Sequence, residues 1–532
     1  MSKIEHDPVQ VREAPWDMDN QDYKAGVSDT IEVKFQGTAA DRHDMSMLGK
    51  KQVLRRQFKF STMLGFASTV MVAWEFVLLV IPFTLKDGGT PGVFWGLLIC
   101  PFVMTPVYAS LAEVASMSPT AGGQYHWVSE LAPPRFQKGL SYSVGWLIAM
   151  GWQTFLCGVS YCTAGLILGL AVLNSDGAYQ IQSWHTTLLT IGIVTFCTLF
   201  NIFLTVRLPL TEAIVLILHI VGVFVVIIPL WVTAPRGNTH DTIFRWEDNA
   251  GWGNVRLAST IGIVPMIGML IGYDCSVHMS EEVQDASRTV PNVIMCAVAG
   301  NAVLLILVGI TLIFCLGDLE SALYSPTYQP VIQIFYNATK SRAGTTVMIS
   351  VIIVIFLSAC VGQVATASRQ MWSFARDRGL PFSGWLEQIA PGWNIPIHAI
   401  IVSATVTSCL SLINIGSYYA FNAFNSLGTV SILFSYTITI GCLIWRRLSG
   451  NPLPARRWSL GKWGLPINIV SLCFTTPMLF FYVWPLENPV TAQNMNWASA
   501  MFGGILIIAA IYYVFKGRKE YIGPVMLVKR ME

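Results

Sequence analysis

The sequence has few charged residues and lacks the motifs of common enzyme classes. Only 12% of its 532 residues are charged, whereas 53% are hydrophobic, and the mean hydropathy is +0.55. This composition excludes a soluble globular domain and predicts a polytopic protein of the lipid bilayer. The formal net charge of +3 is too small to indicate a nucleic-acid partner. No Gly-x-Ser-x-Gly, His-Glu-x-x-His or glycine-rich phosphate motif occurs, so neither enzymatic activity nor a cofactor is expected.

Eleven cysteines are present, but they lack the spacing of metal ligands. Most of them, such as Cys157 and Cys197, fall inside apolar runs, where cysteine acts as a small hydrophobic residue. Neither a disulfide framework nor a metal site is therefore expected. A signal-peptide pattern is also missing, so the first membrane span must serve as the insertion signal. Residues 1–58 are polar and are expected to form a disordered cytosolic tail.

About twelve apolar stretches have the length that a bilayer requires. Their approximate limits are 60–85, 93–115, 139–173, 187–206, 209–233, 256–280, 291–316, 344–375, 396–414, 418–446, 465–485 and 497–516. Most basic loop residues fall on the side of the N-terminal tail, so both termini are expected in the cytosol. We expect a ten-helix core at 59–446, two peripheral helices at 447–516 and a cytosolic C-terminal tail at 517–532.

The sixth span carries a charge and two glycines near its middle. Gly268 and Gly272 bracket the centre, and Asp274 follows directly. A charged side chain at the bilayer centre costs about 2.5–3.5 kcal/mol, so it usually faces a partner or a cavity. An interruption marked by glycine is typical of the substrate site of secondary transporters. The alternative is a continuous helix in which a glycine allows close packing and the carboxylate bonds to a neighbouring helix.

The first span has a similar feature five spans earlier. Trp74 and Glu75 place a ring beside a carboxylate at mid-depth, as Tyr273 and Asp274 do in the sixth span. Spans one to five and six to ten can therefore form the two halves of an inverted repeat. The alternative for Glu75 is a structural hydrogen bond to a neighbouring helix.

Four segments closely resemble signatures of the fungal amino acid/choline transporters, a branch of the amino acid, polyamine and organocation superfamily. These segments are residues 88–91, residues 116–133 with the sequence SMSPTAGGQYHWVSELAP, residues 281–291 and residues 368–377. The resemblance implies an all-α, leucine-transporter-like fold with twelve membrane helices and a 5+5 inverted repeat. Helices one and six would be broken near residues 73–76 and 272–274. It also implies a plasma-membrane transporter that works by alternating access.

The break in helix one differs from that of amino-acid-carrying relatives, which commonly have glycine-serine-glycine there. This chain has Trp74, Glu75 and Phe76 instead. An acidic side chain repels a carboxylate and attracts a cation. Rings hold a methylated ammonium through cation–π contacts worth about 0.5–2 kcal/mol each. We therefore predict import of a small organic cation, with choline as the first candidate. A permease for 4-aminobutyrate, another amino acid or a polyamine is the alternative, and a nutrient receptor without transport is the second alternative.

The predicted substrate site combines rings with two carboxylates. Its residues are Trp74, Glu75, Tyr273 and Asp274, with Trp146, Trp152 and Phe424 as further walls. Tryptophans near span ends are alternatively interfacial anchors. Two close carboxylates cannot easily both stay ionised in low dielectric, so Glu75 or Asp274 is expected to take up a coupled proton. His219 in the fifth span is a further candidate for proton coupling, unless a backbone carbonyl satisfies its ring.

Opposite charges follow helices six and eight on the predicted cytosolic side. Glu281 and Glu282 come after the sixth span, and Arg369 and Arg376 end the eighth. They can form a cytosolic gate that pairs when the inner path is shut, each exposed pair contributing at most about 1 kcal/mol. The alternative is a solvated loop whose charges only set the topology. Glu113 and Glu212, near cytosolic ends of their spans, resemble gate or loop contacts.

Overall fold

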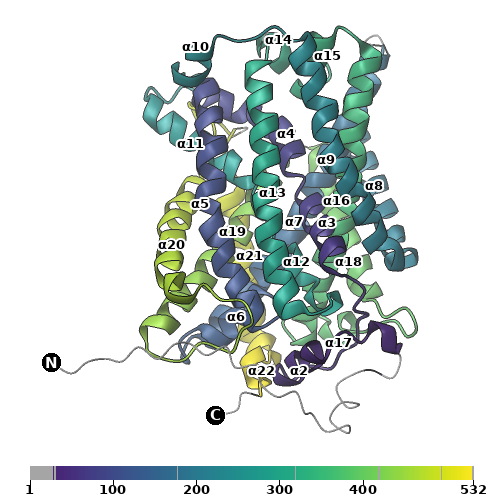
Figure 1. Cartoon of the computed structure of the whole chain (residues 1–532), viewed down its shortest axis with the longest axis vertical. Helices are drawn as coiled ribbons and strands as arrows, with labels where there is room; N and C mark the ends of the chain where they lie inside the picture. Colours follow the sequence, from purple (N-terminus) through teal and green to yellow (C-terminus); the bar gives the residue numbers. More distant parts are fainter. Residues whose placement is uncertain are drawn as a thin grey trace, which may run out of the picture.

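The structure, a computed structural model, describes residues 28, 31–175, 178–317, 319–416, 420–492 and 494–529. The regular elements of these residues are helices that mostly run along the long axis of the molecule (Figure 1). Among them, eleven are long and apolar enough to cross a membrane, and Val255–Gly268 is a shorter apolar helix. The chain is therefore an all-α integral membrane protein, as its composition predicted.

The uninterrupted long helices coincide with ten of the twelve predicted spans. They are α5 (Gly89–Met117), α7 (Gln137–Asn174), α8 (Ser183–Phe203), α9 (Leu208–Thr233), α13 (Ala286–Phe314), α16 (Arg342–Arg376), α18 (Ile397–Ser411), α19 (Ala420–Leu448), α20 (Gly464–Phe481) and α21 (Ala498–Tyr512). Hydropathy located them because a lipid environment demands about 20 consecutive apolar residues from any spanning helix.

The first and sixth spans are each interrupted. The first consists of α3 (Phe60–Met71) and α4 (Ala73–Lys86), and the sixth of α11 (Val255–Gly268) and α12 (Cys275–His278). The two predicted interruptions are thus present. The 5+5 inverted repeat stays a prediction.

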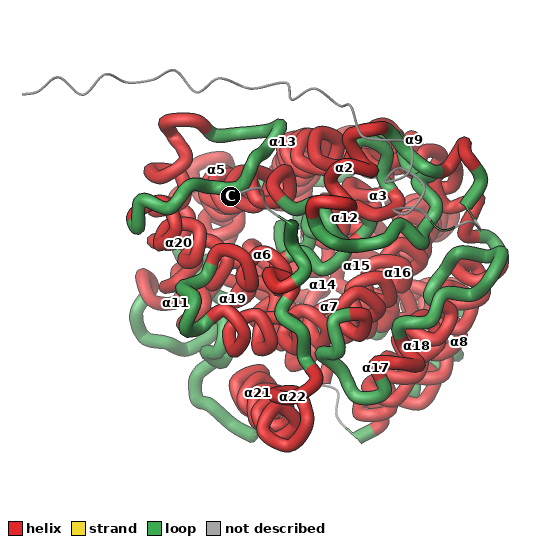
Figure 2. The backbone as a smooth tube through the Cα atoms, turned by 90° about the horizontal axis from the view of Figure 1, so that it is seen from below, coloured by secondary structure: helices red, strands yellow, loops and turns green. Residues whose placement is uncertain are grey.

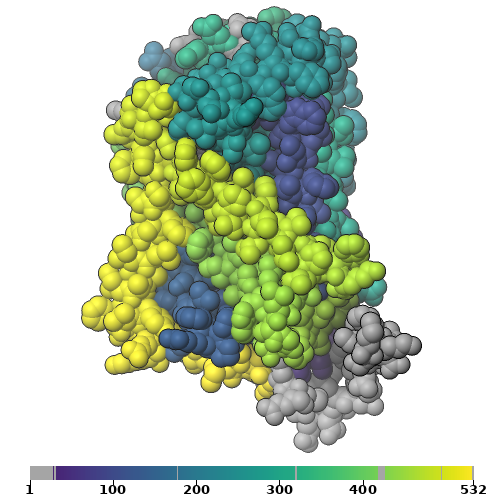
Figure 3. Space-filling model, turned by 90° about the vertical axis from the view of Figure 1, so that its left-hand side faces the viewer, coloured from purple at the N-terminus to yellow at the C-terminus, as the bar shows by residue number. Residues whose placement is uncertain are grey.

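The interrupted helices lie in the interior, whereas the last two long helices lie outside. In the span formed by α3 and α4, 89% of the residues in the most apolar 18-residue stretch are buried. The corresponding share is 22% for the span that contains α20 and 11% for the span that contains α21. Figure 3 shows residues of α20 and α21, in yellow-green and yellow, covering one side of the molecule. The assignment of residues 447–516 as two helices peripheral to a ten-helix core stays a prediction.

Short helices mark the two ends of the bundle. We call the end that carries the N-terminal segment 31–59, α6 (Gln124–Leu131), α17 (Ser383–Leu386) and α22 (Arg518–Glu520) the terminal face. The opposite face carries α10 (Thr239–Phe244), α14 (Leu319–Leu323) and α15 (Pro330–Thr339) (Figure 1).

Part of the N-terminal tail is ordered, so the expectation of disorder throughout residues 1–58 is wrong for residues 31–58. This N-terminal strap contains η1 (Val33–Phe35) and α2 (Ala39–Met47), which lies over the terminal face in Figure 2. The Asp41 carboxylate accepts hydrogen bonds from the amides of Asp285 at 2.8 Å and Ala286 at 2.9 Å, where α13 begins. These contacts are made with segments that are distant in the sequence, so the composition of the strap does not predict that it is ordered.

Candidate functional site

The break in helix one is a single residue. Val72 has φ 42° and ψ 42°, a left-handed conformation that a β-branched residue rarely adopts, and it separates α3 from α4. The interruption frees backbone groups, and Gln363 on α16 donates from Nε2 to the Val70 carbonyl at 3.3 Å. The break therefore lies one residue before the predicted stretch 73–76.

The break in helix six spans residues 269–274. Gly272 has φ 121°, which favours glycine, and a side chain there would come within 3.0 Å of the Met71 sulfur. Tyr108 on α5 satisfies the exposed backbone, because its hydroxyl donates to the Leu270 carbonyl and accepts from the Gly272 amide at 3.2 Å. The two breaks therefore meet at Met71 and Gly272, held from one side by a tyrosine that our reading of the sequence did not single out.

Glu75 and His219 form a buried pair beside the break in helix one. The Glu75 side chain is fully buried, and its Oε1 lies 2.7 Å from His219 Nδ1 on α9. Trp74 donates from Nε1 to the His219 carbonyl at 3.1 Å, so its indole also points toward α9. Glu75 thus makes the hydrogen bond to a neighbouring helix that was the alternative for it, and its partner is the predicted coupling histidine.

The surrounding hydrogen bonds define the protonation of this pair. Asn301 on α13 donates from Nδ2 to the Ser68 carbonyl at 3.2 Å, which turns its Oδ1 toward His219 Nε2 at 3.0 Å. Nε2 must therefore carry a hydrogen, and the 2.7 Å contact between Nδ1 and Glu75 needs one more. The pair is neutral overall in this arrangement. Loss of the shared proton leaves a net charge of −1 at the break.

Asp274 is saturated by protein donors. Its Oδ1 accepts from the Tyr436 hydroxyl at 2.6 Å, and its Oδ2 accepts from Gln124 Nε2 at 2.7 Å and faces His278 Nε2 at 3.2 Å. Among the described residues no hydrogen bond joins Asp274 to Glu75, so the two carboxylates belong to separate networks. Gln124 lies in the predicted signature segment, which therefore holds the start of α12 in place.

Two predicted rings lie at the breaks. Trp152 is fully buried, and a side chain at Gly272 would contact its Cη2 at 3.4 Å. Tyr273 stacks edge-on against Tyr108 with 5.0 Å between the ring centroids. Within the described part of the chain, Trp152 Nε1, the Tyr273 hydroxyl and Glu75 Oε2 are buried and have no hydrogen-bond partner. These are the groups that can bond to a small solute at the breaks.

Trp146, another predicted wall, is not brought to the breaks. Trp146 packs against Tyr142 and against Tyr512 on α21, with ring centroids 6.4 and 6.2 Å away. The side chain of Phe424 lies outside the part of the chain that the structure describes.

Glu212 lies between helices one, five and eight, at a position that the sequence interpretation treated as a gate or loop contact. It is fully buried on α9, and its Oε2 accepts from the Thr69 hydroxyl on α3 at 2.5 Å. A side chain at Gly362 on α16 would lie 3.6 Å from Oε1. A lone buried carboxylate among three helices is a candidate proton carrier. Glu113, by contrast, does contact a loop, because Arg456 donates to it at 3.0 Å.

The charged residues after helices six and eight form two ion pairs on the terminal face. Arg376 donates to Glu281 at 2.6 and 2.9 Å, and Arg369 donates to Glu282 at 2.8 Å. We call these pairs the charge gate. Burial acts to raise the pKa of Glu281, but Arg376 outweighs it and the pKa falls to about 2. These charged residues are therefore paired in this structure and do not form a solvated loop, whereas their role as a gate stays a prediction.

The N-terminal strap adds charges to the gate. Lys50 Nζ lies 3.3 Å from Asp377 Oδ2, and Arg56 donates to the carbonyls of Ser280 at 3.0 Å and Val283 at 2.5 Å. Asp377 is 327 residues from Lys50, and the two carbonyls are 224 and 227 residues from Arg56, so the sequence alone does not pair them.

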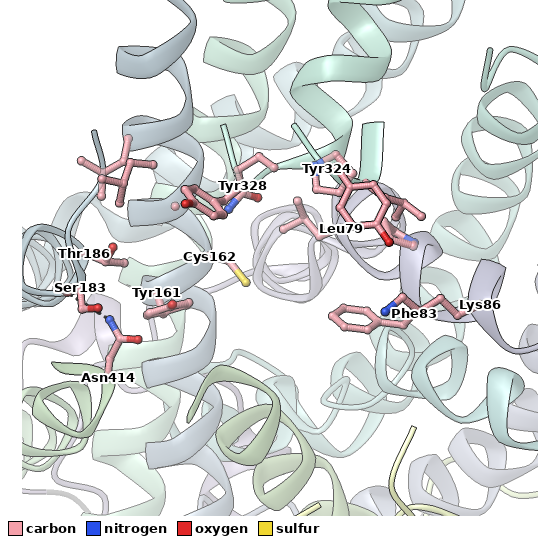
Figure 4. A pocket seen from close by; sticks show the side chains of 17 residues that line it. Leu79, Phe83, Lys86, Tyr161, Cys162, Ser183, Thr186, Tyr324, Tyr328 and Asn414 are labelled. Atoms are coloured by element: carbon pink, nitrogen blue, oxygen red, sulfur yellow. Dashed lines mark hydrogen bonds between the residues drawn. The ribbon is translucent and has the colours of Figure 1, made fainter. Parts of the chain in front are cut away.

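The opposite face is hollow. A cavity of about 440 Å³ lies between α4, α7, α8 and the segment from α14 to α15, as Figure 4 shows. The aromatic residues Phe83, Tyr161, Tyr324 and Tyr328 line this cavity. Among its described lining residues, the charged one is Lys86. A smaller space of about 50 Å³ shares Leu79 and Phe83 with this cavity and includes Phe76, the neighbour of Glu75. The two spaces therefore share lining residues on α4, the half of helix one that follows the break.

Comparison with known proteins identifies the broad activity. Residues 58–510 match the family model described as amino acid permease. A Macrophomina phaseolina protein named as an amino acid/polyamine transporter is 32% identical over 82% of this chain and 97% of its own length. The choline transporter of Saccharomyces cerevisiae is 26% identical over 88% of this chain and 83% of its own, and the GABA-specific permease of that yeast is 27% identical over 94% and 88%. The relatives are transporters, which confirms the predicted transporter resemblance and the prediction that the chain is not an enzyme.

Proposed function

Because the chain belongs to the amino acid permease family, we propose that it imports a small amine-bearing solute by alternating access. The terminal face would lie in the cytosol and the opposite face outside a plasma membrane, as the distribution of basic residues indicates. The observation that carries this proposal is the meeting of two interrupted helices, with a sealed charge gate below them and a cavity above.

Choline is the first candidate solute. When the shared proton of the Glu75–His219 pair is lost, a net charge of −1 lies at the break in helix one, and Trp152 and Tyr273 lie at the break in helix six that meets it. A methylated ammonium needs such a charge together with ring faces. The similarity to a yeast choline transporter supports this candidate.

A cation in the solute site and the shared proton of the Glu75–His219 pair compete for the same negative charge. A cation gains from Glu75 only when the proton has left, so this proton cannot enter together with the cation. Proton symport then needs a second carrier, and we assign that role to Glu212, which lies between helices one, five and eight. His219 would tune the charge of the solute site.

The second candidate is 4-aminobutyrate, and one observation favours it. The charged group among the described residues that line the cavity of about 440 Å³ is the Lys86 ammonium. It is held by Glu487 at 2.5 Å, and once released it can bind the carboxylate of 4-aminobutyrate, which choline lacks. The similarity to the yeast GABA-specific permease points the same way. A receptor that binds its solute without transport is the third candidate.

Counterflow in proteoliposomes tests these candidates. Labelled choline and labelled 4-aminobutyrate are each measured with the native protein, with Glu75→Gln and with Glu247→Gln as a control on the opposite face. We expect choline counterflow with the native protein and with Glu247→Gln, and its loss in Glu75→Gln, because the amide cannot supply the negative charge.

Three outcomes contradict the choline proposal in different ways. Counterflow of 4-aminobutyrate but not choline, unchanged in Glu75→Gln, would establish the second candidate. Binding of either solute without counterflow would establish a receptor. Choline counterflow that survives Glu75→Gln would remove Glu75 from the solute site.

A further inference from the structure

Asp87 is a fully buried carboxylate at the end of α4 on the opposite face. It follows the first membrane span directly, and its side chain is 0% exposed. No described residue donates to either carboxylate oxygen in hydrogen-bond geometry; the Trp252 indole N–H approaches the carboxylate but is itself left without a geometric partner. A buried ionised carboxylate without donors is costly, so this environment favours the protonated, neutral form.

The residue sits at a joint between three segments. Its backbone forms a bridge with Asp248 in the loop before α11, and a side chain at Gly262 on α11 would collide with its carbonyl group. One turn earlier, the Thr84 hydroxyl donates to the Gly262 carbonyl at 2.8 Å. Asp87 therefore lies where the halves of helices one and six that point to the opposite face pack against each other.

The charged groups that face Asp87 are mostly acidic. Burial is the largest cause that raises its pKa, to about 7; Asp248 and Glu487 raise it further, whereas the Trp252 N–H and Lys86 lower it. Lys86 compensates weakly because its Nζ is bound to Glu487 at 2.5 Å. The negative end of the α4 dipole also disfavours an ionised carboxylate at this position.

We propose that Asp87 is a proton-binding site on the opposite face, and that the bound proton stabilises the packing of α4 against α11 and the loop around Asp248. The ligand is a proton from solution on that side of the membrane. The site is separate from the Glu75–His219 pair and does not depend on which solute is carried.

The sign of the pH effect follows from the raised pKa. In this packing Asp87 keeps its proton up to about pH 7, whereas a solvated aspartate ionises near its ordinary value of 3.8. The packed arrangement is therefore favoured in acid, and its stability falls as the pH rises from the ordinary carboxyl range through about 7.

Thermal unfolding of the purified full-length protein in detergent, measured from about pH 5 to 8.5, tests the site without any transport assay. We expect the native Tm to fall across this range and Asp87→Asn to flatten the profile, because the amide mimics the protonated acid. Asp241→Asn, an exposed change on the same face, should keep the native profile. A native profile in folded Asp87→Asn would overturn the proposal.

Two neighbouring variants keep the test decisive if Asp87→Asn does not fold. Asp248→Asn removes a charge that raises the pKa of Asp87, and Glu487→Gln removes another and frees Lys86. Both should move the midpoint of the Tm profile to lower pH. An unmoved midpoint in both variants would also overturn the proposal, whether or not the protein transports choline.

Discussion

Glu75 and His219 show why the charge of a residue at mid-membrane depends on its partner. Each was singled out because an ionisable side chain inside an apolar run is expensive. Their contact joins positions 144 residues apart, and no periodicity in the sequence indicates it. The same holds for Asp274, whose donors Gln124 and Tyr436 come from α6 and α19. The sequence thus predicts which residues matter, whereas folding decides which of them keeps its charge.

Replacing Glu212 by Gln tests the proposed proton carrier. The variant keeps the side-chain volume and removes the titratable group between helices one, five and eight. We expect uptake driven by a pH gradient to fall to the equilibrium level, while counterflow of the same solute continues, since counterflow needs no net proton movement. Both are measured in proteoliposomes.

His219→Gln is the matched comparison for Glu212→Gln. It removes the other titratable group of α9 and leaves Glu212 in place. If His219→Gln abolishes gradient-driven uptake and Glu212→Gln does not, then His219, and not Glu212, carries the coupled proton.

At the scale of elements, hydropathy located the spans because lipid imposes their length and composition. The break in helix six was also predictable from the sequence, since a glycine at position 272 permits the observed φ of 121°. The break in helix one contains no glycine, and it was indicated by the Trp74–Glu75 pair and by the family resemblance. The N-terminal strap was missed because Asp285, Ala286 and Asp377 order it, and none of these belongs to the strap itself.

The charge gate should not titrate in the physiological range. The pKa of Glu281 is lowered to about 2, so the stabilisation is present above the ordinary carboxyl range and is lost only as the pH falls through about 2. Arg376→Gln leaves Glu281 buried without its partner and should cost about 3–5 kcal/mol. The double variant Glu281→Gln, Arg376→Gln should be more stable than Arg376→Gln, as measured by thermal unfolding.

This prediction is contradicted if the double variant is no more stable than Arg376→Gln. The loss of stability in Arg376→Gln would then come from the cation–π contact of the guanidinium, whose Cζ lies 4.3 Å from the centre of the Trp372 ring, and not from an unpaired Glu281.

The whole molecule is asymmetric along its long axis. The terminal face is closed by the charge gate, by the strap and by residues after α22, where the Lys529 amide donates to the Met47 carbonyl at 2.7 Å. The opposite face holds the cavity of about 440 Å³. Alternating access requires that one face opens as the other closes. Under the proposed alternating access, this arrangement corresponds to the state that receives solute from the opposite face.

The variant Ser183→Cys can report this asymmetry, because Ser183 lines the cavity and is exposed, whereas the native Cys162 is buried. In intact cells we expect a membrane-impermeant maleimide to label Ser183→Cys more strongly than the native protein. Arg376→Gln should lower the labelling, because a weakened charge gate shifts the population toward the state that is closed on the opposite face. Peptide mass spectrometry measures the labelled fraction. Undiminished labelling in a folded Arg376→Gln variant would mean that the two faces open independently, which is the behaviour of a channel and not of a carrier.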